Sequence, residues 1–288
     1  RDRVGRLMRW PDDAKDWPLT SYSRRLLHRP HRWHIQEHGT GPLILLIHGA
    51  GGATQSFRGL FPLLAETHRV IAIDLPGQGF TQLGAQQRCG LDHMAEDLLA
   101  LCRNQDWVPE IVVGHSAGAA IALRMWELGM QSGKGIVGIN AALGNFKGVA
   151  GWLFPMMAKA LAATPFSAGI FASTTTRSGV RSLVEGTGSS LDQQGLELYY
   201  RLARDKGHVD ATLSMMAQWS LDGLLARLNR IDVPVHLITG SNDKAVPPLV
   251  SRDAAQHLPN ATLTELPDLG HLAHEEDPAK IADLIIQT

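Results

Sequence analysis

The segment Ile111–Ala120 constrains this chain more than any other, because it places a serine in a very sharp turn between a strand and a helix. The β-branched run Ile111–Val113 predicts a buried strand, and Ala119–Leu128 predicts a helix. Between them, Gly114-His-Ser-Ala-Gly118 has the Gly-x-Ser-x-Gly spacing, which removes side chains where strand and helix approach most closely. We therefore expect a strained backbone at Ser116, with its hydroxyl exposed at the carboxyl edge of a sheet. An ordinary Gly/Ala-rich turn is the alternative interpretation.

Strands and helices alternate on both sides of this turn. Trp33–Glu37 alternates apolar and polar residues, as an edge strand does, and further strands are predicted at 43–47, 70–73, 136–139, 235–239 and 261–266. Helices are predicted at 91–102 and 278–286. This rhythm is typical of an α/β fold, with a mostly parallel central sheet and helices on both faces. Residues 33–140 and 231–288 are predicted to form this core.

Residues 1–32 are predicted to form a basic N-terminal arm, since they hold nine of the 27 Lys and Arg residues and only four acidic ones. Three prolines interrupt any helix there. We expect an irregular arm laid across the domain and anchored by Trp10 and Trp17. A solvated basic tail is the alternative.

Bulk composition excludes several classes of protein. The formal net charge of −1 does not suggest binding to nucleic acid. Two cysteines, Cys89 and Cys102, make no disulfide framework, which favours a reducing, cytoplasmic location. No apolar run approaches the ~20 residues needed to cross a bilayer, so a soluble protein is expected. Peripheral contact with a membrane stays open.

A glycine-rich segment follows the predicted strand at 43–47. In His48-Gly-Ala-Gly-Gly52, glycines let backbone amides approach a ligand closely, so the Ala50 N–H is expected to pair with the Ala117 N–H as an oxyanion hole. His48 is expected to be a structural hydrogen-bonding residue. Asp74, which ends the next strand, is expected to cap the following turn through backbone N–H groups.

Two later loops carry an acid and a base. Asp243 follows the strand at 235–239, which is where the acidic partner of a histidine belongs, and His271 follows the last strand. His274 lies in the next turn and is expected to be a packing or capping residue. Ser116, Asp243 and His271 are therefore the candidate catalytic residues, in the order serine, acid, histidine.

Residues 141–230 contain helix-length apolar segments and no strand pattern, including one at Leu213–Leu228. We expect a helical cap inserted above the sheet edge where Ser116 points. Because this region is rich in methionine and aromatic residues, it predicts a pocket for a bulky apolar ligand, although ordinary core packing is the alternative. The pocket residues proposed from the sequence are His115, Phe154, Met157, His208, Met215, Met216 and Trp219.

Five features together resemble the α/β-hydrolase superfamily over residues 33–288: His-Gly-x-Gly-Gly, Asp-x-Pro-Gly-x-Gly, the serine turn, the acid loop and the terminal Gly-His. The resemblance implies an α/β-hydrolase fold and acyl transfer. His271 would take the Ser116 proton and Asp243 would orient the imidazole. This chemistry needs no metal and no cofactor.

A narrower resemblance is to the magnesium-chelatase accessory proteins of bacteriochlorophyll synthesis. The segments that carry it reach into the arm and the cap: Trp17-Pro18, Trp33-His-Ile-Gln36, Gly186-Thr-Gly-Ser189, Met215-Met-Ala-Gln-Trp219 and Gly270-His-Leu-Ala-His-Glu-Glu276. Gln78 and Phe57 depart from that family's usual His and Trp. The resemblance implies a tetrapyrrole ligand, a porphyrin or its magnesium form, with a magnesium-chelatase subunit as a partner. His208, in a predicted loop, would then reach a central magnesium; a structural role is the alternative.

Two functions stay open at this point. One is a serine hydrolase that cleaves an ester on a pigment precursor or another acyl compound. The other is a non-catalytic tetrapyrrole carrier or chelatase partner built on the same scaffold.

Overall fold

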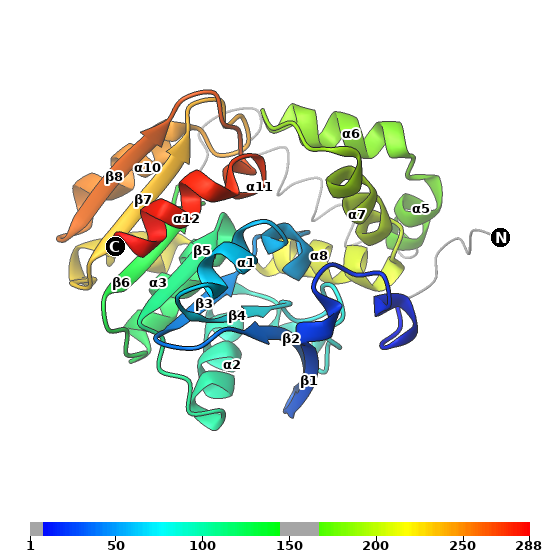
Figure 1. Ribbon diagram of the computed structural model, residues 1–288, viewed down its shortest axis with the longest axis horizontal. Helices are drawn as coiled ribbons and strands as arrows, with labels where there is room; N and C mark the ends of the chain where they lie inside the picture. The colour runs from blue at the N-terminus through cyan, green and yellow to red at the C-terminus, as the bar shows by residue number, and fades with distance from the viewer. Residues whose placement is uncertain (1–7, 145–166) are drawn as a thin grey trace.

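The computed structural model describes residues 8–144 and 167–288, and its centre is one eight-stranded sheet (Figure 1). The strand order is β1-β2-β4-β3-β5-β6-β7-β8, and every pairing from β4 to β8 is parallel. The strands are β1 (Ser23–His28), β2 (His31–His38), β3 (Leu43–Ile47), β4 (Arg69–Ile73), β5 (Ile111–His115), β6 (Gly135–Ile139), β7 (Val235–Gly240) and β8 (Ala261–Leu266). The predicted α/β fold with a mostly parallel sheet is confirmed.

The two faces of the sheet are covered by different helices. In β3, Leu45 and Ile47 pack with α2 (Leu91–Asn104) and α3 (Ala117–Glu127), whereas Ile44 and Leu46 pack with α1 (Leu60–Ala65) and α12 (Pro278–Ile286). Figure 1 shows α1 and α12 next to each other in front of the sheet. Successive residues of a strand face opposite sides, so a strand covered on both faces is apolar throughout. The remaining core helices are α10 (Pro248–His257) and α11 (Ala273–Glu276), with short 3₁₀ turns at Asp12–Ala14, Thr20–Tyr22, Thr54–Phe57 and Gln86–Arg88.

The N-terminal arm differs from the prediction of an irregular segment up to residue 32. Ser23–His28 forms β1, which pairs antiparallel with β2, so Trp33–Glu37 lies inside the sheet instead of at its edge. Pairing along the whole hairpin satisfies backbone groups that an irregular arm would leave to water. The tryptophan anchors are as expected: Trp17 is buried and its Nε1 donates to Thr54 Oγ1 at 3.2 Å, and Trp10 is half-buried.

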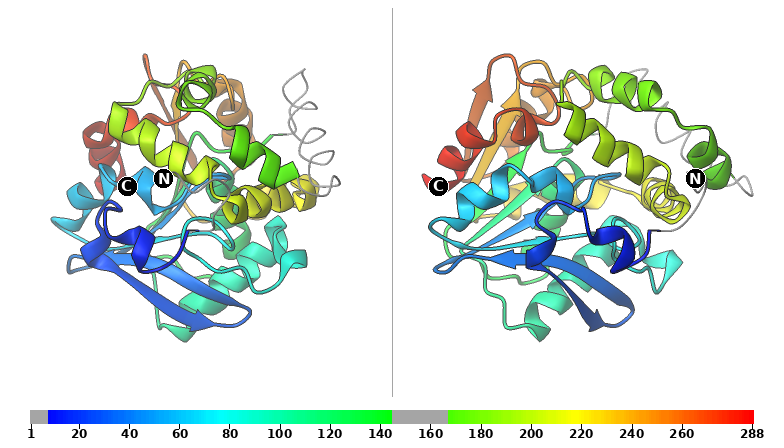
Figure 2. Two further views of the ribbon diagram at one scale, coloured as in Figure 1. Left: turned by 90° about the vertical axis from the view of Figure 1, so that its right-hand side faces the viewer. Right: turned by 45° about the vertical axis from the view of Figure 1, so that its right-hand side comes forward.

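Between β6 and β7 the described residues form helices. These are α5 (Ser167–Thr174), α6 (Arg177–Gly186), α7 (Gln193–Ala203), α8 (Lys206–Gln218) and α9 (Asp222–Leu225), with a 3₁₀ turn at Leu228–Arg230. Figures 1 and 2 show α5, α6 and α7 grouped on one side of the molecule, and we call the described part, residues 167–230, the cap. The predicted apolar segment Leu213–Leu228 is divided, because the extended backbone of Trp219 ends α8.

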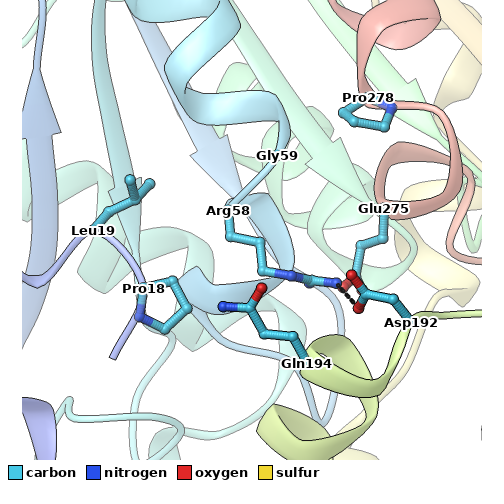
Figure 3. A pocket seen from close by; sticks show the side chains of 8 residues that line it. All are labelled: Pro18, Leu19, Arg58, Gly59, Asp192, Gln194, Glu275 and Pro278. Carbon is cyan, nitrogen blue, oxygen red and sulfur yellow. Dashed lines mark hydrogen bonds and ion pairs between the residues drawn. The ribbon is translucent and has the colours of Figure 1, made fainter. Parts of the chain in front are cut away.

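A buried carboxylate joins the cap to the core. Glu275 on α11 accepts a hydrogen bond from the Tyr199 hydroxyl of α7 at 2.6 Å, and it forms an ion pair with Arg58. Arg58 also lies 3.6 Å from Asp192, which precedes α7, and these side chains line a cavity of about 500 Å³ (Figure 3). Burial raises the pKa of Glu275 from 4.5 to about 7, although Arg58 acts to lower it.

This raised pKa predicts a pH dependence of stability. Between pH 4.5 and 7 the folded protein holds a proton on Glu275 that the unfolded chain has lost, so the contribution of Glu275 to the free energy of unfolding falls as pH rises. Glu275→Gln cannot titrate, so the stability of the wild type relative to this variant should decrease across that range. Denaturant unfolding at a series of pH values measures the difference. The wild type compared with Glu185→Gln, a change at an exposed position on α6, should show no such trend. A stability of the wild type relative to Glu275→Gln that increases across this pH range would contradict the prediction.

Candidate active site

Ser116 occupies the sharp turn that the sequence predicts. Its backbone has φ 52° and ψ −117°, outside the regions that a serine ordinarily adopts, between β5 and the first turn of α3. A Cβ on Gly118 would lie 2.3 Å from the carbonyl oxygen of Ile47, so only glycine allows α3 to approach the end of β3 this closely. The serine hydroxyl is thereby fixed at the carboxyl edge of the sheet.

The structure brings Ser116, His271 and Asp243 into one hydrogen-bonded chain. His271 Nε2 lies 3.1 Å from Ser116 Oγ, and His271 Nδ1 lies 2.8 Å from Asp243 Oδ2. A carboxylate only accepts hydrogen bonds, so the proton belongs on Nδ1 and Nε2 is left to accept from the serine hydroxyl. This arrangement can remove a proton from Ser116 as the oxygen attacks a carbonyl carbon.

Asp243 is held by groups that the sequence analysis missed. Its side chain is fully buried, and its Oδ1 accepts from the Ala245 and Val246 amides at 2.9 and 2.8 Å. Its Oδ2 also accepts from Asn140 Nδ2 at 2.8 Å. Asn140 follows β6 and has φ 46°, a left-handed conformation that asparagine tolerates. The sequence signal that could have identified this partner of Asp243 is an asparagine directly after a buried strand.

The glycine-rich segment lies beside the serine. A Cβ on Gly49 would come within 2.9 Å of Ser116 Cβ, which puts the following amide close to the reacting oxygen. In the described part of the chain, neither the Ala50 nor the Ala117 amide donates a hydrogen bond, so both are free to receive an oxyanion. Gly51 is fixed on both sides, because its N–H donates to Gln78 Oε1 at 2.8 Å and its carbonyl accepts from His208 Nε2 at 3.1 Å.

The surroundings of His208 differ from the loop that the sequence predicts. It lies in α8, not in a loop, and is buried. Its Nδ1 accepts from the Gly79 amide at 3.1 Å while Nε2 is bonded to Gly51, so both ring nitrogens are occupied. Burial lowers the pKa of His208 to about 4. His208 also borders the cavity above Ser116, but both of its ring nitrogens are bonded to the backbone of Gly51 and Gly79.

An apolar cavity of about 440 Å³ opens above Ser116. It is bordered by Ser116 and His271, by the glycine-rich segment and by apolar side chains of α5, α6 and α8; the lining includes Gly49, Ala50, His115, Phe171, Val180, Leu183, Val209, Leu213, Met216 and Leu272. A cavity of this size accommodates a drug-sized ligand. His115 and Met216 therefore lie where the sequence prediction put them.

Met215 and Trp219 do not line this cavity. Met215 is buried in the core and its sulfur accepts from Gln78 Nε2 at 3.3 Å, and Trp219 packs against the same core. Successive helical residues point about 100° apart, so Met215 and Met216 cannot face the same side of α8. Phe154 and Met157 lie outside the described residues.

Two further histidines surround His271. His115 Nε2 donates to the His271 carbonyl at 2.8 Å, and the His115 and His274 rings lie 4.4 Å apart. Burial lowers the pKa of His274 to about 3 and that of His115 well below 6.5, so both are neutral at pH 7. Neither ring nitrogen of His274 has a hydrogen-bond partner within the described structure. His274 is thus a packing residue, as expected.

A second serine, histidine and aspartate share the same connectivity. His34 Nε2 lies 2.9 Å from Ser23 Oγ, and His34 Nδ1 lies 2.6 Å from Asp74 Oδ2. Asp74 also accepts from the Thr54 and Phe80 amides, which confirms its expected capping of the turn. Ser23 does not border the cavity above Ser116. This cluster joins β1, β2 and β4, and Ser23 provides a control for Ser116.

The described residues contain neither a candidate membrane span nor a candidate metal site. No helix among them is long and apolar enough to cross a membrane. No three His, Cys, Asp or Glu side chains in residues 8–144 and 167–288 gather closely enough to hold a metal ion.

Comparisons with known proteins agree with this fold. The family model for the alpha/beta hydrolase fold matches residues 42–278. The magnesium-chelatase 30 kDa subunit of Rhodobacter capsulatus is 44% identical over 94% of this chain and 95% of its own length. The pimeloyl-(acyl-carrier protein) methyl ester esterase of Nitrosomonas europaea is 28% identical, over 83% of this chain and 92% of its own.

A solved structure shows the same fold. An alpha/beta hydrolase fold protein from Burkholderia ambifaria superposes with a TM-score of 0.78 at 22% identity, covering 93% of this chain and 98% of its own. With the serine turn, the parallel sheet and the family match in agreement, this chain belongs to the α/β-hydrolase fold family and, within it, to the family of the magnesium-chelatase 30 kDa subunit.

Proposed function

We propose that this protein is a serine hydrolase that cleaves an ester or acyl bond of a bulky apolar compound. The observation that carries the proposal is the hydrogen-bonded chain Ser116–His271–Asp243 at the base of an apolar cavity, beside two unbonded amides. Each of these groups has a defined part in acyl transfer, and the apolar lining favours a substrate with few polar groups.

The reaction follows from the positions of these groups. Ser116 Oγ attacks the carbonyl carbon while His271 Nε2 takes the hydroxyl proton, and the Ala50 and Ala117 amides hold the oxyanion. The bond to the leaving alcohol breaks as that alcohol receives the proton from Nε2, which leaves an acyl-serine. Water then attacks the acyl carbon, gives its proton to His271, and Ser116 regains a proton as the acid departs. Asp243 stabilises the imidazolium in both steps.

The substrate class is inferred from the relative at 44% identity, whose name makes it a magnesium-chelatase subunit. We infer an association with bacteriochlorophyll synthesis, a substrate ester on a tetrapyrrole or similar precursor, and contact with a magnesium-chelatase subunit. A non-catalytic carrier would have no need of a serine held in a strained conformation against a histidine base. The intact site therefore favours hydrolysis over the carrier alternative.

Peripheral contact with a lipid surface is part of the same proposal. Ile170, Phe171 and Leu183 are exposed apolar residues of α5 and α6, and the latter two also border the cavity. An apolar substrate dissolved in a bilayer would enter the cavity from this side without crossing water. The protein is otherwise expected in the cytoplasm.

Covalent labelling tests the nucleophile. A fluorophosphonate probe should label the wild type at Ser116, and Ser116→Ala should abolish labelling and lower kcat by ~10⁴–10⁶-fold for any ester that is cleaved. Ser23→Ala is the matched control, because Ser23 has the same histidine and aspartate connectivity, and it should label like the wild type. Labelling that survives in Ser116→Ala and disappears in Ser23→Ala would reverse the assignment. An unlabelled wild type would favour the carrier.

Quenching of tryptophan fluorescence tests the ligand. Protoporphyrin IX and its magnesium form should bind saturably, and Met216→Ala should weaken binding about tenfold, since a lost apolar contact of about 1.4 kcal/mol raises Kd by that factor. Met215→Leu is the control, because Met215 lies in the core instead of the cavity lining. Saturable binding that Met216→Ala leaves unchanged would mean that the porphyrin binds elsewhere.

A further inference from the structure

Residues 187–190, between α6 and α7, lie directly against the loops that carry Asp243 and His271. The Thr187 carbonyl accepts from the Lys244 amide at 3.0 Å, one residue after Asp243, and from the His271 amide at 3.4 Å. Gly188 has φ 87°, and a Cβ there would lie 1.8 Å from the Asn242 carbonyl oxygen. A Cβ on Gly270 would lie 2.3 Å from the Gly188 carbonyl, so these two glycines also pack backbone against backbone. Through these residues, which we call the 187–190 segment, the cap contacts both the loop of Asp243 and the loop of His271.

Ser189 makes the side-chain contacts of this segment. Its side chain is buried, and its Oγ accepts from the Leu272 amide at 2.8 Å while donating to Glu276 Oε2 at 2.8 Å. The same oxygen of Glu276 accepts from the Gly270 amide at 2.8 Å. The residues before and after His271 are therefore both held by the pair Ser189–Glu276. His115 holds the carbonyl of His271 itself.

We propose that Ser189 is a positioning residue, through which the cap fixes the backbone of His271 and so the reach of its imidazole to Ser116. This inference rests on the proposed hydrolase function. Ser189 has no hydrogen bond to Ser116 or to Asp243, so its effect passes through the loop. Without its hydroxyl, the Leu272 amide loses its acceptor and Glu276 Oε2 keeps only the bond from the Gly270 amide, so the loop that sets the 3.1 Å contact with Ser116 loosens.

The positions next to Ser189 supply a matched control. Ser190 is exposed and contacts Glu276 only through its backbone amide, at 3.0 Å, so Ser190→Ala keeps that bond. Ser189→Thr keeps the hydroxyl that accepts and donates. A comparison of Ser189→Ala, Ser189→Thr and Ser190→Ala therefore isolates one hydroxyl group.

The experiment measures rate per active site in the full chain, with sites counted by fluorophosphonate titration. Ser189→Ala should lower the rate of Ser116 labelling and the kcat for p-nitrophenyl esters by ~10–100-fold with KM little changed, because small displacements of a base are costly. Ser190→Ala should match the wild type and Ser189→Thr should recover most of the rate. A role in folding alone would lower the number of sites and Tm but leave the rate per site unchanged.

A second measurement separates this inference from the proposed function. The NMR signal of the His271 Nδ1 proton, which bridges to Asp243, should broaden in Ser189→Ala and persist in Ser190→Ala, whether or not the protein turns over an ester. If the wild type fails to label but this signal responds as expected, the hydrolase proposal fails and the positioning role stands. An Ser189→Ala variant with unchanged rate and unchanged signal overturns the positioning role. Equal losses in Ser190→Ala overturn it as well.

Discussion

The close approach of α3 to the end of β3 fixes the turn of Ser116, which the other groups of the site surround. Gly118 packs against the carbonyl of Ile47, and this contact forces the turn that strains Ser116 and exposes its hydroxyl. The same contact brings the glycine-rich segment after β3 alongside the serine. Because β3 and β5 are parallel neighbours, their carboxyl ends meet there without any long-range adjustment. One backbone contact thus sets both the serine turn and the segment beside it.

Features encoded within a few residues were predictable from the sequence. The serine turn, the capping role of Asp74 and the loops of Asp243 and His271 each depend on local spacing and on the ends of buried strands. Contacts between distant segments were not predictable, because periodicity carries no information about which elements meet. Asn140 bonds to a loop 103 residues away, and His208 bonds to Gly51, 157 residues away. β1 was not predicted, because its strand pattern is weak and its stability comes from pairing with β2.

Burial keeps the histidines around His271 neutral. The pKa of His274 falls to about 3, and that of His115 falls well below 6.5. At neutral pH neither ring adds a positive charge beside His271. Asp243, which is bonded to His271 Nδ1, therefore acts on the imidazole without competition from these two neighbours.

The cap has two physical connections to the catalytic core, and they have different consequences. The Tyr199–Glu275–Arg58 contact joins α7 to α11 and bears on stability, since Glu275 is buried and titratable. The 187–190 segment instead bonds the loops on either side of His271 and next to Asp243. Thr187 and Leu272 line the cavity together with α5 and α6. The segment that bonds the loop of His271 therefore also forms part of the wall of the cavity above Ser116.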